Sequence, residues 1–482
     1  MIHPRNAVTE ERWTAAIDRL AAGEVTLLGL WGDTSRVHMA LLDGNDVSVL
    51  TYACKDGRFP SVGAKHPPAI RLERAIRDLF GLDAVDAPDA RPWLDLGFWD
   101  VRHPLGNKQP AEPPRPYAFL PSEGEGLHQI PVGPVHAGII EPGHFRFTAN
   151  GEHVVRLEQR LGYVHKGIES LMAGASLDRA AKLASRTSGD STVAYAYAFA
   201  LAAEMALQAT APPRAAYSRA LMAELERLAN HLGDIGAICN DASFALMHAQ
   251  TGILRERCLR AAAACFGHRL MMDVIVPGGI ARDIAPEGPA SLRALLVEIR
   301  RVFPRLVELY DNTASLQDRT VTTGITKPEY VRQFGAGGYV GRACGRAFDA
   351  RRAFGYAPYG DLEFEVPVLD AGDVNARVWI RIREVEQSLA LIEQIIDRLP
   401  GGAVMAPMAL KAGEGLALVE AFRGDVLVWL RLDAAGRVER CHLRDASWFQ
   451  WPLLETAIEG NIVADFPLCN KSFNCSYSGH DL

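Results

Sequence analysis

The most informative absence in this sequence is that of paired cysteines. The chain has 482 residues and eight cysteines, none of which forms a Cys-x-x-Cys pair. Such pairs are typical of iron–sulfur clusters and zinc ribbons, because two closely spaced thiolates can bind the same metal. We therefore expect eight free thiols in a reducing compartment, most of them small core residues, and no metal cluster held by this chain.

A hydrophobic segment long enough to cross a bilayer is also missing. The best candidate, residues 191–203, is uncharged but is closed off by Asp190 and Glu204. It is shorter than the roughly 20 apolar residues that a membrane-spanning helix needs. The N-terminal residues MIHPRNAVTEERW contain no apolar core of a signal peptide. These features predict a cytoplasmic protein that meets a membrane only through partners.

An excess of basic charge is lacking as well. The 51 lysines and arginines face 58 acidic residues, which gives a net charge of −7. Because nucleic-acid-binding proteins usually carry a basic surface, nucleic acid is not a predicted partner. The 48% of hydrophobic and 23% of charged residues are typical of a globular protein. The length predicts about two to four domains.

Residues 1–105 are predicted to form a small α+β domain. Residues 25–30 and 47–52 are apolar and strand-like, and residues 70–82 have apolar side chains at helical spacing. A proline-rich linker over residues 106–128 follows, since proline fixes φ and lacks the backbone donor that helices and sheets need. The alternative for this segment is a surface loop within one domain.

Residues 129–482 are predicted to form a larger, mainly helical domain with peripheral β structure, so the fold class is α+β. Leucines between positions 221 and 232 step by four, three and four residues and make one apolar stripe. A Ser/Gly/Asp cluster before residue 192 is expected to cap the helix that follows. The predicted elements are helices over 192–203, 221–232 and 385–399 and strands over 362–368 and 426–432.

Two polar segments are candidate sites for proton transfer. The turn-rich stretch 133–144 contains His136 and His144, and imidazole titrates near neutral pH. In the next segment His165 and Glu169 lie four residues apart and would share one face of a helix, where a carboxylate can exchange a proton with histidine. The alternatives are a polar surface hairpin and a solvated ion pair.

Two further segments have incomplete ligand patterns. Residues 335–341 nearly match the phosphate-binding pattern GxGxxG, but valine stands at the third glycine position, and no clear strand–turn–helix unit surrounds it. Cys469, Cys475 and His480 are potential zinc ligands, but a structural site needs a fourth. A structural turn and an ordered C-terminal tail are therefore the preferred interpretations.

The order of motifs along the chain resembles one protein family. Residues 133–171 resemble the start of the large subunit of energy-converting (group 4, formate hydrogenlyase-type) [NiFe] hydrogenases. They are also similar to the quinone-chamber subunit of respiratory complex I, the NADH-quinone oxidoreductase. Residues 71–105 resemble the small complex I subunit that is often fused ahead of it. The likeness continues in RALMAELERLANHLGDIG (219–236), VPGGIARDI (276–284), GGYVGRACGRAFDARR (337–352), LEFEVPVLDAGDVNARVWIRIREVEQSL (362–389) and RGDVLVWLRLD (423–433).

The resemblance implies an altered metal site. In the hydrogenases two Cys-x-x-Cys pairs hold nickel and iron, and the matching positions here are Ser188, Ser191, Ser476 and Gly479. Serine hydroxyls are hard, weakly acidic ligands, whereas these metals need soft thiolate donors. All four ligand positions are thus vacated, and no Ni–Fe site is expected.

The match to complex I is incomplete as well. That family places a tyrosine and a histidine against the quinone headgroup. The histidine corresponds to His144, whereas the tyrosine position falls at Gly189, with Tyr195 or Tyr197 as substitutes one or two turns later.

The resemblance implies a subunit that carries electrons from a [4Fe–4S] cluster in an iron–sulfur partner subunit to a quinone-type or other acceptor. It would dock on membrane-arm subunits, at the cytoplasmic face of the inner membrane. Glu169 and Arg186 keep the family's pattern, and Arg186 would stabilise a reduced intermediate. The implied proton and quinone site consists of His144, Glu169 and Arg186, with His136, His165, Ser188 and Ser191 beside them.

Two alternatives remain open. The chain could be a non-catalytic structural coupling subunit, or a hydrogenase large subunit with atypical ligands drawn from Cys469, Cys475 and His480.

Overall fold

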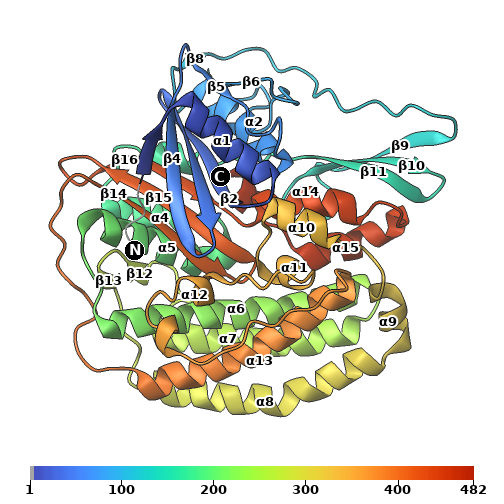
Figure 1. Cartoon of the computed structure of the whole chain (residues 1–482). Coiled ribbons are helices and arrows are strands. Elements are labelled where there is room, and N and C mark those ends of the chain that lie inside the picture. Colours follow the sequence, from blue (N-terminus) through green and yellow to red (C-terminus); the bar gives the residue numbers. More distant parts are fainter. Residues whose placement is uncertain (1–4) are drawn as a thin grey trace.

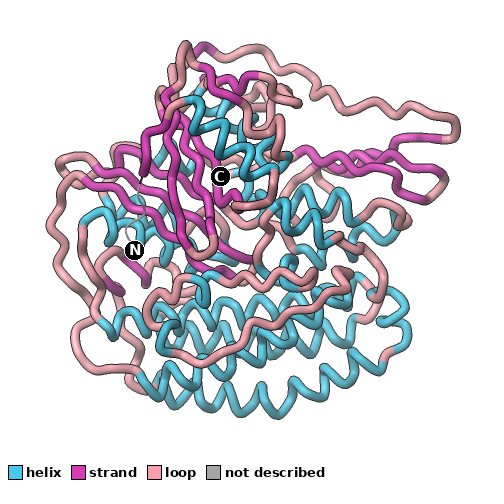
Figure 2. Tube along the Cα trace, in the orientation of Figure 1, coloured by secondary structure: helices cyan, strands magenta, loops and turns pink. Residues whose placement is uncertain are grey.

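The computed structural model describes residues 5–482, so the first four residues of the predicted N-terminal domain lie outside the described part. Long helices form a layer along one side of the molecule, and β-sheets with shorter helices cover it (Figure 1). Figure 2 shows the same division between helices and strands. This arrangement confirms the α+β class. Within residues 5–482 no helix is both long and apolar enough to span a membrane.

The N-terminal region is a four-stranded sheet with two helices packed on it. The strand order is β1-β4-β3-β2, with β1 parallel to β4 and the other pairs antiparallel. The strands predicted over 25–30 and 47–52 and the helix over 70–82 are confirmed. The helix ends where Gly81 takes a left-handed conformation (φ 71°), which costs glycine no Cβ strain. The bounds are β1 Arg5–Val8, α1 Glu10–Ala21, β2 Thr26–Asp33, β3 Arg36–Asp43, β4 Asp46–Ala53 and α2 Ile70–Phe80.

This sheet shares its hydrophobic core with the rest of the chain. On one face, Leu28 and Trp31 belong to the same buried cluster as Leu427 and Trp429 near the C-terminus. The two tryptophan rings lie 5.5 Å apart between centroids. The N-terminal region is therefore packed into the larger one rather than tethered beside it.

The proline-rich segment follows the surface. Residues 111–126 contain neither helix nor strand. Arg74 donates to the hydroxyl of Tyr117 at 2.8 Å, and Arg91 donates to the carbonyl of Ala118 at 2.8 Å, so the segment is held in place. The domain boundaries at 105 and 128 stay predictions. The flanking strands are β5 Arg58–Pro60, β6 Asp83–Val85, β7 Val101–Arg102, β8 Gln109–Pro110, β9 Leu127–Val132, β10 His144–Asn150 and β11 His153–Arg160.

Four long helices form the helical layer, with α6 against both α7 and α13 (Figure 1). The predicted leucine stripe of α6 is confirmed, because all four leucines are buried. The helix predicted over 385–399 is the second half of α13. The bounds are α6 Pro213–Asp241, α7 Ala245–Phe266, α8 Gly288–Asn312 and α13 Val374–Arg398.

Helix α5 (Thr192–Leu207) is buried on nearly every side. It packs against both α6 and the C-terminal sheet. Glycines 413 and 415 of that sheet come so near that a Cβ on either would collide with an α5 backbone carbonyl. The small residues of α5 therefore serve close backbone packing.

The C-terminal sheet confirms one predicted strand, and the other was wrong. Residues 426–432 lie in β15, but residues 362–368 form no strand. There the amides of Glu363 and Glu365 donate to the side chains of Gln394 and Gln387 on α13 at 2.9 and 3.0 Å. The segment thus lies along a helix, and side chains replace a partner strand. The sheet is β14 Gly413–Ala421, β15 Gly424–Leu432 and β16 Val438–Arg444.

The remaining elements are short and connect these layers. They are the helices α3 Ile168–Met172, α4 Leu177–Ala184, α9 Ala314–Thr320, α10 Pro328–Phe334, α11 Gly338–Arg342, α12 Ala350–Ala353, α14 Ser447–Ala457, α15 Phe466–Phe473 and α16 Tyr477–Asp481, the 3-10 turns Pro67–Ala69, Gly189–Ser191, Tyr359–Asp361 and Val463–Asp465, and the strands β12 Ile275–Val276 and β13 Gly279–Ile280.

Candidate functional site

The four positions that the resemblance gives as vacated metal ligands come together in space. The hydroxyl oxygens of Ser188 and Ser476 lie 2.9 Å apart, although the residues are 288 positions apart in the chain. Ser476 also accepts a hydrogen bond from the amide of Gly479 at 2.8 Å. Arg423 donates to the hydroxyl of Ser191 at 3.2 Å. Ser188, Ser191, Ser476, Asp190 and Arg423 are called the serine cluster below.

One arginine holds the serine cluster together. Arg423, in the turn between β14 and β15, donates two hydrogen bonds to the carboxylate of Asp190, one of them 2.7 Å long. Burial would raise the pKa of Asp190, but the charge and hydrogen bonds of Arg423 outweigh it and lower the pKa. Ser188 donates to the same carboxylate at 2.9 Å. The cluster is thus an ion pair surrounded by hydroxyls.

The capping of α5 differs from the prediction. No side chain of the Ser/Gly/Asp cluster caps this helix. Glu226 of α6 accepts from the amides of Val193 and Ala194 instead, at 2.7 and 3.2 Å. Ser188 and Asp190 are committed to the serine cluster, so an acceptor from another helix satisfies the free amides. Burial raises the pKa of Glu226 to about 8.

The serine cluster does not fit a nickel–iron centre. Two of its hydroxyls bond each other, and Gly479 offers no side chain. A Cβ at Gly479 would lie 2.6 Å from a carboxylate oxygen of Asp445. That oxygen accepts a hydrogen bond from the hydroxyl of Tyr195 at 2.8 Å. Hydroxyl and carboxylate oxygens have replaced the soft donors that this metal pair requires.

Tyrosines 195 and 197 have different surroundings. Tyr195 reaches the serine cluster through Asp445, whereas the hydroxyl of Tyr197 donates to the carbonyl of Ala357 at 2.8 Å. Gly189, the position of the family's quinone tyrosine, has open space where a Cβ would lie. Tyr195 is therefore the substitute that neighbours the vacated site.

Glu169 lies in an ionic group of its own. It is 5% exposed, and it accepts from His442 at 2.9 Å and from the amide of Leu443 at 3.0 Å. A nitrogen of Arg440 lies 2.8 Å from its other oxygen. Burial would raise the pKa of Glu169, but Arg440 and His442 outweigh burial and lower it to about 2.

The predicted pair of His165 and Glu169 on one helix face was wrong, and so was its solvated alternative. Gly167 takes a left-handed conformation (φ 67°), and α3 begins only at Ile168. His165 lies outside the helix, stacks on Trp99 and bonds the carbonyl of Asp481 at 2.7 Å.

Arg186 and the two loop histidines lie in separate networks. Arg186 makes a half-exposed, two-pronged ion pair with Asp273, both bonds 2.8 Å. His144 bonds the carbonyl of Gly133 and accepts from Arg146, so its ring is neutral, and burial lowers its pKa. Across the described residues, no hydrogen bond or ion pair joins His144, Glu169 and Arg186 to one another.

The histidine loop nevertheless reaches the C-terminal half of the vacated site. The carboxylate of Glu141 accepts from the amide of Ser478 at 2.9 Å. The rings of His136 and Tyr477 lie 6.4 Å apart. Lys166, which the sequence did not single out, donates to the carbonyls of Thr187 and Ser478 and so bridges both halves.

The remaining ligand candidates do not converge. His480 stacks on Trp448 at 4.0 Å and bonds Asp481 at 2.8 Å, while burial raises the pKa of the Cys469 thiol to about 11. In the described part of the chain no three His, Cys, Asp or Glu side chains converge on one metal position. In the 335–341 loop, a Cβ at Gly338 would collide with the carbonyl of Arg423, so backbone rather than phosphate fills the turn.

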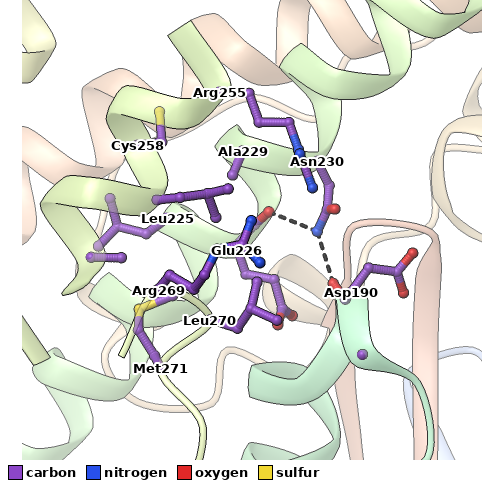
Figure 3. Close-up of a pocket in the computed structure, with 13 residues that line it drawn as sticks. Asp190, Leu225, Glu226, Ala229, Asn230, Arg255, Cys258, Arg269, Leu270 and Met271 are labelled. Atoms are coloured by element: carbon purple, nitrogen blue, oxygen red, sulfur yellow. Dashed lines mark hydrogen bonds between the residues drawn. The ribbon is translucent and has the colours of Figure 1, made fainter. Parts of the chain in front are cut away.

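A cavity of about 190 Å³ lies beside the serine cluster. Gly189 and Asp190 form one wall, and α6, α7 and residues 269–271 form the others (Figure 3). Asn230 bonds the carbonyls of Asp190 and Glu226 at 2.8 and 2.9 Å. No local sequence signal points to this cavity, because its walls come from three distant segments.

Comparison with known proteins agrees with this geometry. Residues 12–115 match the model of the respiratory-chain NADH dehydrogenase 30 kDa subunit, and residues 242–412 match that of the 49 kDa subunit. Formate hydrogenlyase subunit 5 of Escherichia coli is 33% identical over 436 residues, which are 88% of this chain and 77% of that protein. A protein of the NADH-quinone oxidoreductase of Desulfotalea psychrophila is 32% identical over 72% of this chain and 93% of its own length.

A solved structure shares the fold. A chain of the archaeal membrane-bound sulfane sulfur reductase superposes with a TM-score of 0.70 and 24% identity, over 74% of this chain and 99% of that one. The chain therefore belongs to the family of complex I- and group 4 hydrogenase-related subunits, with a 30 kDa-type region ahead of a 49 kDa-type region.

Proposed function

We propose that this chain is the acceptor-site subunit of a membrane-associated oxidoreductase complex. It receives electrons from a [4Fe–4S] cluster in an iron–sulfur partner subunit and delivers them to a quinone-type acceptor. It docks through partners on a membrane arm, at the cytoplasmic face of the inner membrane. The relatives named NADH-quinone oxidoreductase and hydrogenase support this assignment.

The observation that carries the proposal is the serine cluster. The vacated ligand positions stay together, joined by the 2.9 Å contact between Ser188 and Ser476, but their donors are oxygens. Such a site can hold and pass protons, because each hydroxyl both donates and accepts a hydrogen bond. The chain itself holds no cofactor in this proposal, so electrons come from the partner and protons from this chain.

Candidate proton groups lie on both sides of the cluster. Tyr195 donates to Asp445 on one side, and the loop with His136, Glu141 and His144 contacts the C-terminal helix on the other. Proton transfer needs hydrogen-bonded or water-bridged neighbours, which these contacts supply. Glu169 and Arg186 hold charge nearby in their own ion pairs, as positioning groups.

The test uses the native complex with a soluble quinone analogue. We expect quinone-dependent turnover that falls in Tyr195→Phe and His144→Gln, because both variants keep the packing and remove a proton group. Glu393→Gln, on the surface of α13, is the control and should leave turnover unchanged. Absence of any quinone response in the unaltered complex would remove the quinone assignment, and stoichiometric nickel in this subunit would contradict the serine-cluster argument.

Structural coupling without chemistry is the second candidate. It is favoured by one observation: Glu169 and Arg186 are both fully engaged in ion pairs, with Arg440 and His442 and with Asp273. It predicts that folded Tyr195→Phe and His144→Gln complexes keep full activity, which is the opposite of the main proposal.

A further inference from the structure

The cavity beside the serine cluster has a charged and an apolar part. Its polar lining includes Arg255 of α7 and Arg269 of the following segment, together with Asn230 of α6 (Figure 3). The apolar lining is supplied by Leu225, Ala229, Cys258, Leu259, Ala262, Leu270 and Met271.

The two cavity arginines lack the partners that other arginines of α7 have. Within residues 5–482, neither Arg255 nor Arg269 makes a hydrogen bond or an ion pair with another side chain. By contrast, Arg257 pairs with Glu298 and Arg260 pairs with Glu256, both at 2.9 Å. Unpaired guanidinium groups at one cavity are an attractive site for an anion.

The carboxyl groups of the lining do not cancel this positive charge. Asp190 is already bonded to Arg423 by two hydrogen bonds. Glu226 accepts from two amides of α5, and burial raises its pKa to about 8, so it is mainly uncharged at neutral pH. The charge of Glu256, which both arginines sense, is paired with Arg260.

We propose that this cavity binds a small organic anion, a monocarboxylate with a short apolar body. Its carboxylate lies between Arg255 and Arg269, where the planar guanidinium groups can donate paired hydrogen bonds. Its apolar part lies against Leu225 and Leu259. A volume of about 190 Å³ holds a body of several carbon atoms and excludes larger cofactors.

The bound anion would act on the serine cluster through the shared wall. Gly189 and Asp190 line the cavity, and Asn230 ties the carbonyl of Asp190 to α6 at 2.8 Å. The ligand therefore contacts the loop that carries Ser188. This site is independent of the quinone assignment, because it rests on the cavity and its charges alone.

Calorimetric titration of the folded chain, or of its native complex, tests the site. The probes are benzoate and butyrate, with phosphate and chloride at matched ionic strength. We expect saturable binding of benzoate and butyrate, weakened by roughly tenfold or more in Arg255→Gln and in Arg269→Gln because each loses a charged hydrogen bond. Arg257→Gln is the matched control on the same helix and should bind as the unaltered chain does.

A second variant separates filling from charge. Gly189→Phe keeps both arginines but places a ring at a position with open space and no positive φ, so it should block binding while circular dichroism stays unchanged. Equal binding of phosphate or chloride would show a nonspecific anion surface and overturn the proposal. So would weakening in Arg257→Gln as large as in Arg255→Gln, or carboxylate binding that survives Gly189→Phe.

Discussion

The serine cluster and the ion-pair network of the helical layer are both buried polar regions, but different forces hold them together. In the network, Arg342 donates to Glu384 at 2.8 Å and to Glu420 at 2.9 Å. His231 lies 2.7 Å from Glu384, and Arg351 bonds both Asp349 and Glu224. In the serine cluster only the pair of Asp190 and Arg423 is charged, and the other contacts join hydroxyls.

The difference separates stability from adaptability. A buried charge without its partner is costly, so the network tolerates little change. A neutral hydroxyl that loses one bond costs far less. The region where the family places metals has thus become the more replaceable of the two, and the network that fixes α6 against α13 has kept its charges.

Breaking the network should give the largest effect. Glu384→Leu leaves Arg342 with an uncompensated buried charge, and we expect a loss of about 3–5 kcal/mol in the free energy of unfolding. Glu393→Leu, which removes an exposed partner of Arg300, should cost less than about 1 kcal/mol. Chemical denaturation of both variants gives the comparison, and equal losses would contradict it.

The pH dependence of stability should separate a charged carboxyl from a neutral one. The folded pKa of Glu169 is about 2, below its usual 4.5, so its contribution is present above pH 4.5 and is lost as pH falls toward 2. That of Glu226 is about 8, so its contribution is present below pH 4.5 and is lost as pH rises toward 8. Asp190 and Arg227 are the charges facing Glu226.

Glutamine variants test these opposite slopes, each at most about 1.4 kcal/mol per pH unit. Glu169→Gln should flatten the acid side of the stability profile, and Glu226→Gln should flatten the side between pH 4.5 and 8. Denaturation midpoints across pH measure both. A Glu226→Gln profile that still falls with rising pH as steeply as the unaltered one would show that Glu226 is charged.

The sequence predicted long-range architecture better than local polar contacts. The leucine stripe of α6 and the helix ending at Gly81 follow from periodicity and from one residue's conformational freedom. The strand at 362–368 could not be excluded, because its amides are satisfied by Gln387 and Gln394 of a later helix. Alternation alone does not show what will bond the backbone.

The candidate site shows the same limit. The resemblance located Ser188 and Ser476, but their partner Arg423 and the Glu226 cap come from segments with no local signal for either role. The left-handed turn at Gly167 separated His165 from the helix of Glu169. Buried polar contacts depend on which distant segments meet, and spacing within one segment does not encode that.

Breaking the charged pair of the serine cluster should have an intermediate effect. Arg423→Gln removes the two bonds to Asp190, whose side chain is 37% exposed and can be hydrated in part. We therefore expect a loss of about 1–2 kcal/mol, less than for Glu384→Leu. Thermal and chemical denaturation measure it. A loss as large as that of Glu384→Leu would place the serine cluster among the charged cores.

The smallest effects compare one hydroxyl in each region. Ser188→Ala removes its bonds to Ser476 and Asp190, and Ser476 keeps its bond from the amide of Gly479. Ser388→Ala removes a 2.8 Å bond to the buried carboxylate of Glu224, which shares its charge with Arg351. We expect about 1 kcal/mol for Ser188→Ala and about 2 kcal/mol for Ser388→Ala, because hydrogen bonds to buried charges are stronger. If Ser188→Ala proves the costlier in denaturation experiments, then the hydroxyls themselves, rather than the pair of Asp190 and Arg423, hold the vacated site together.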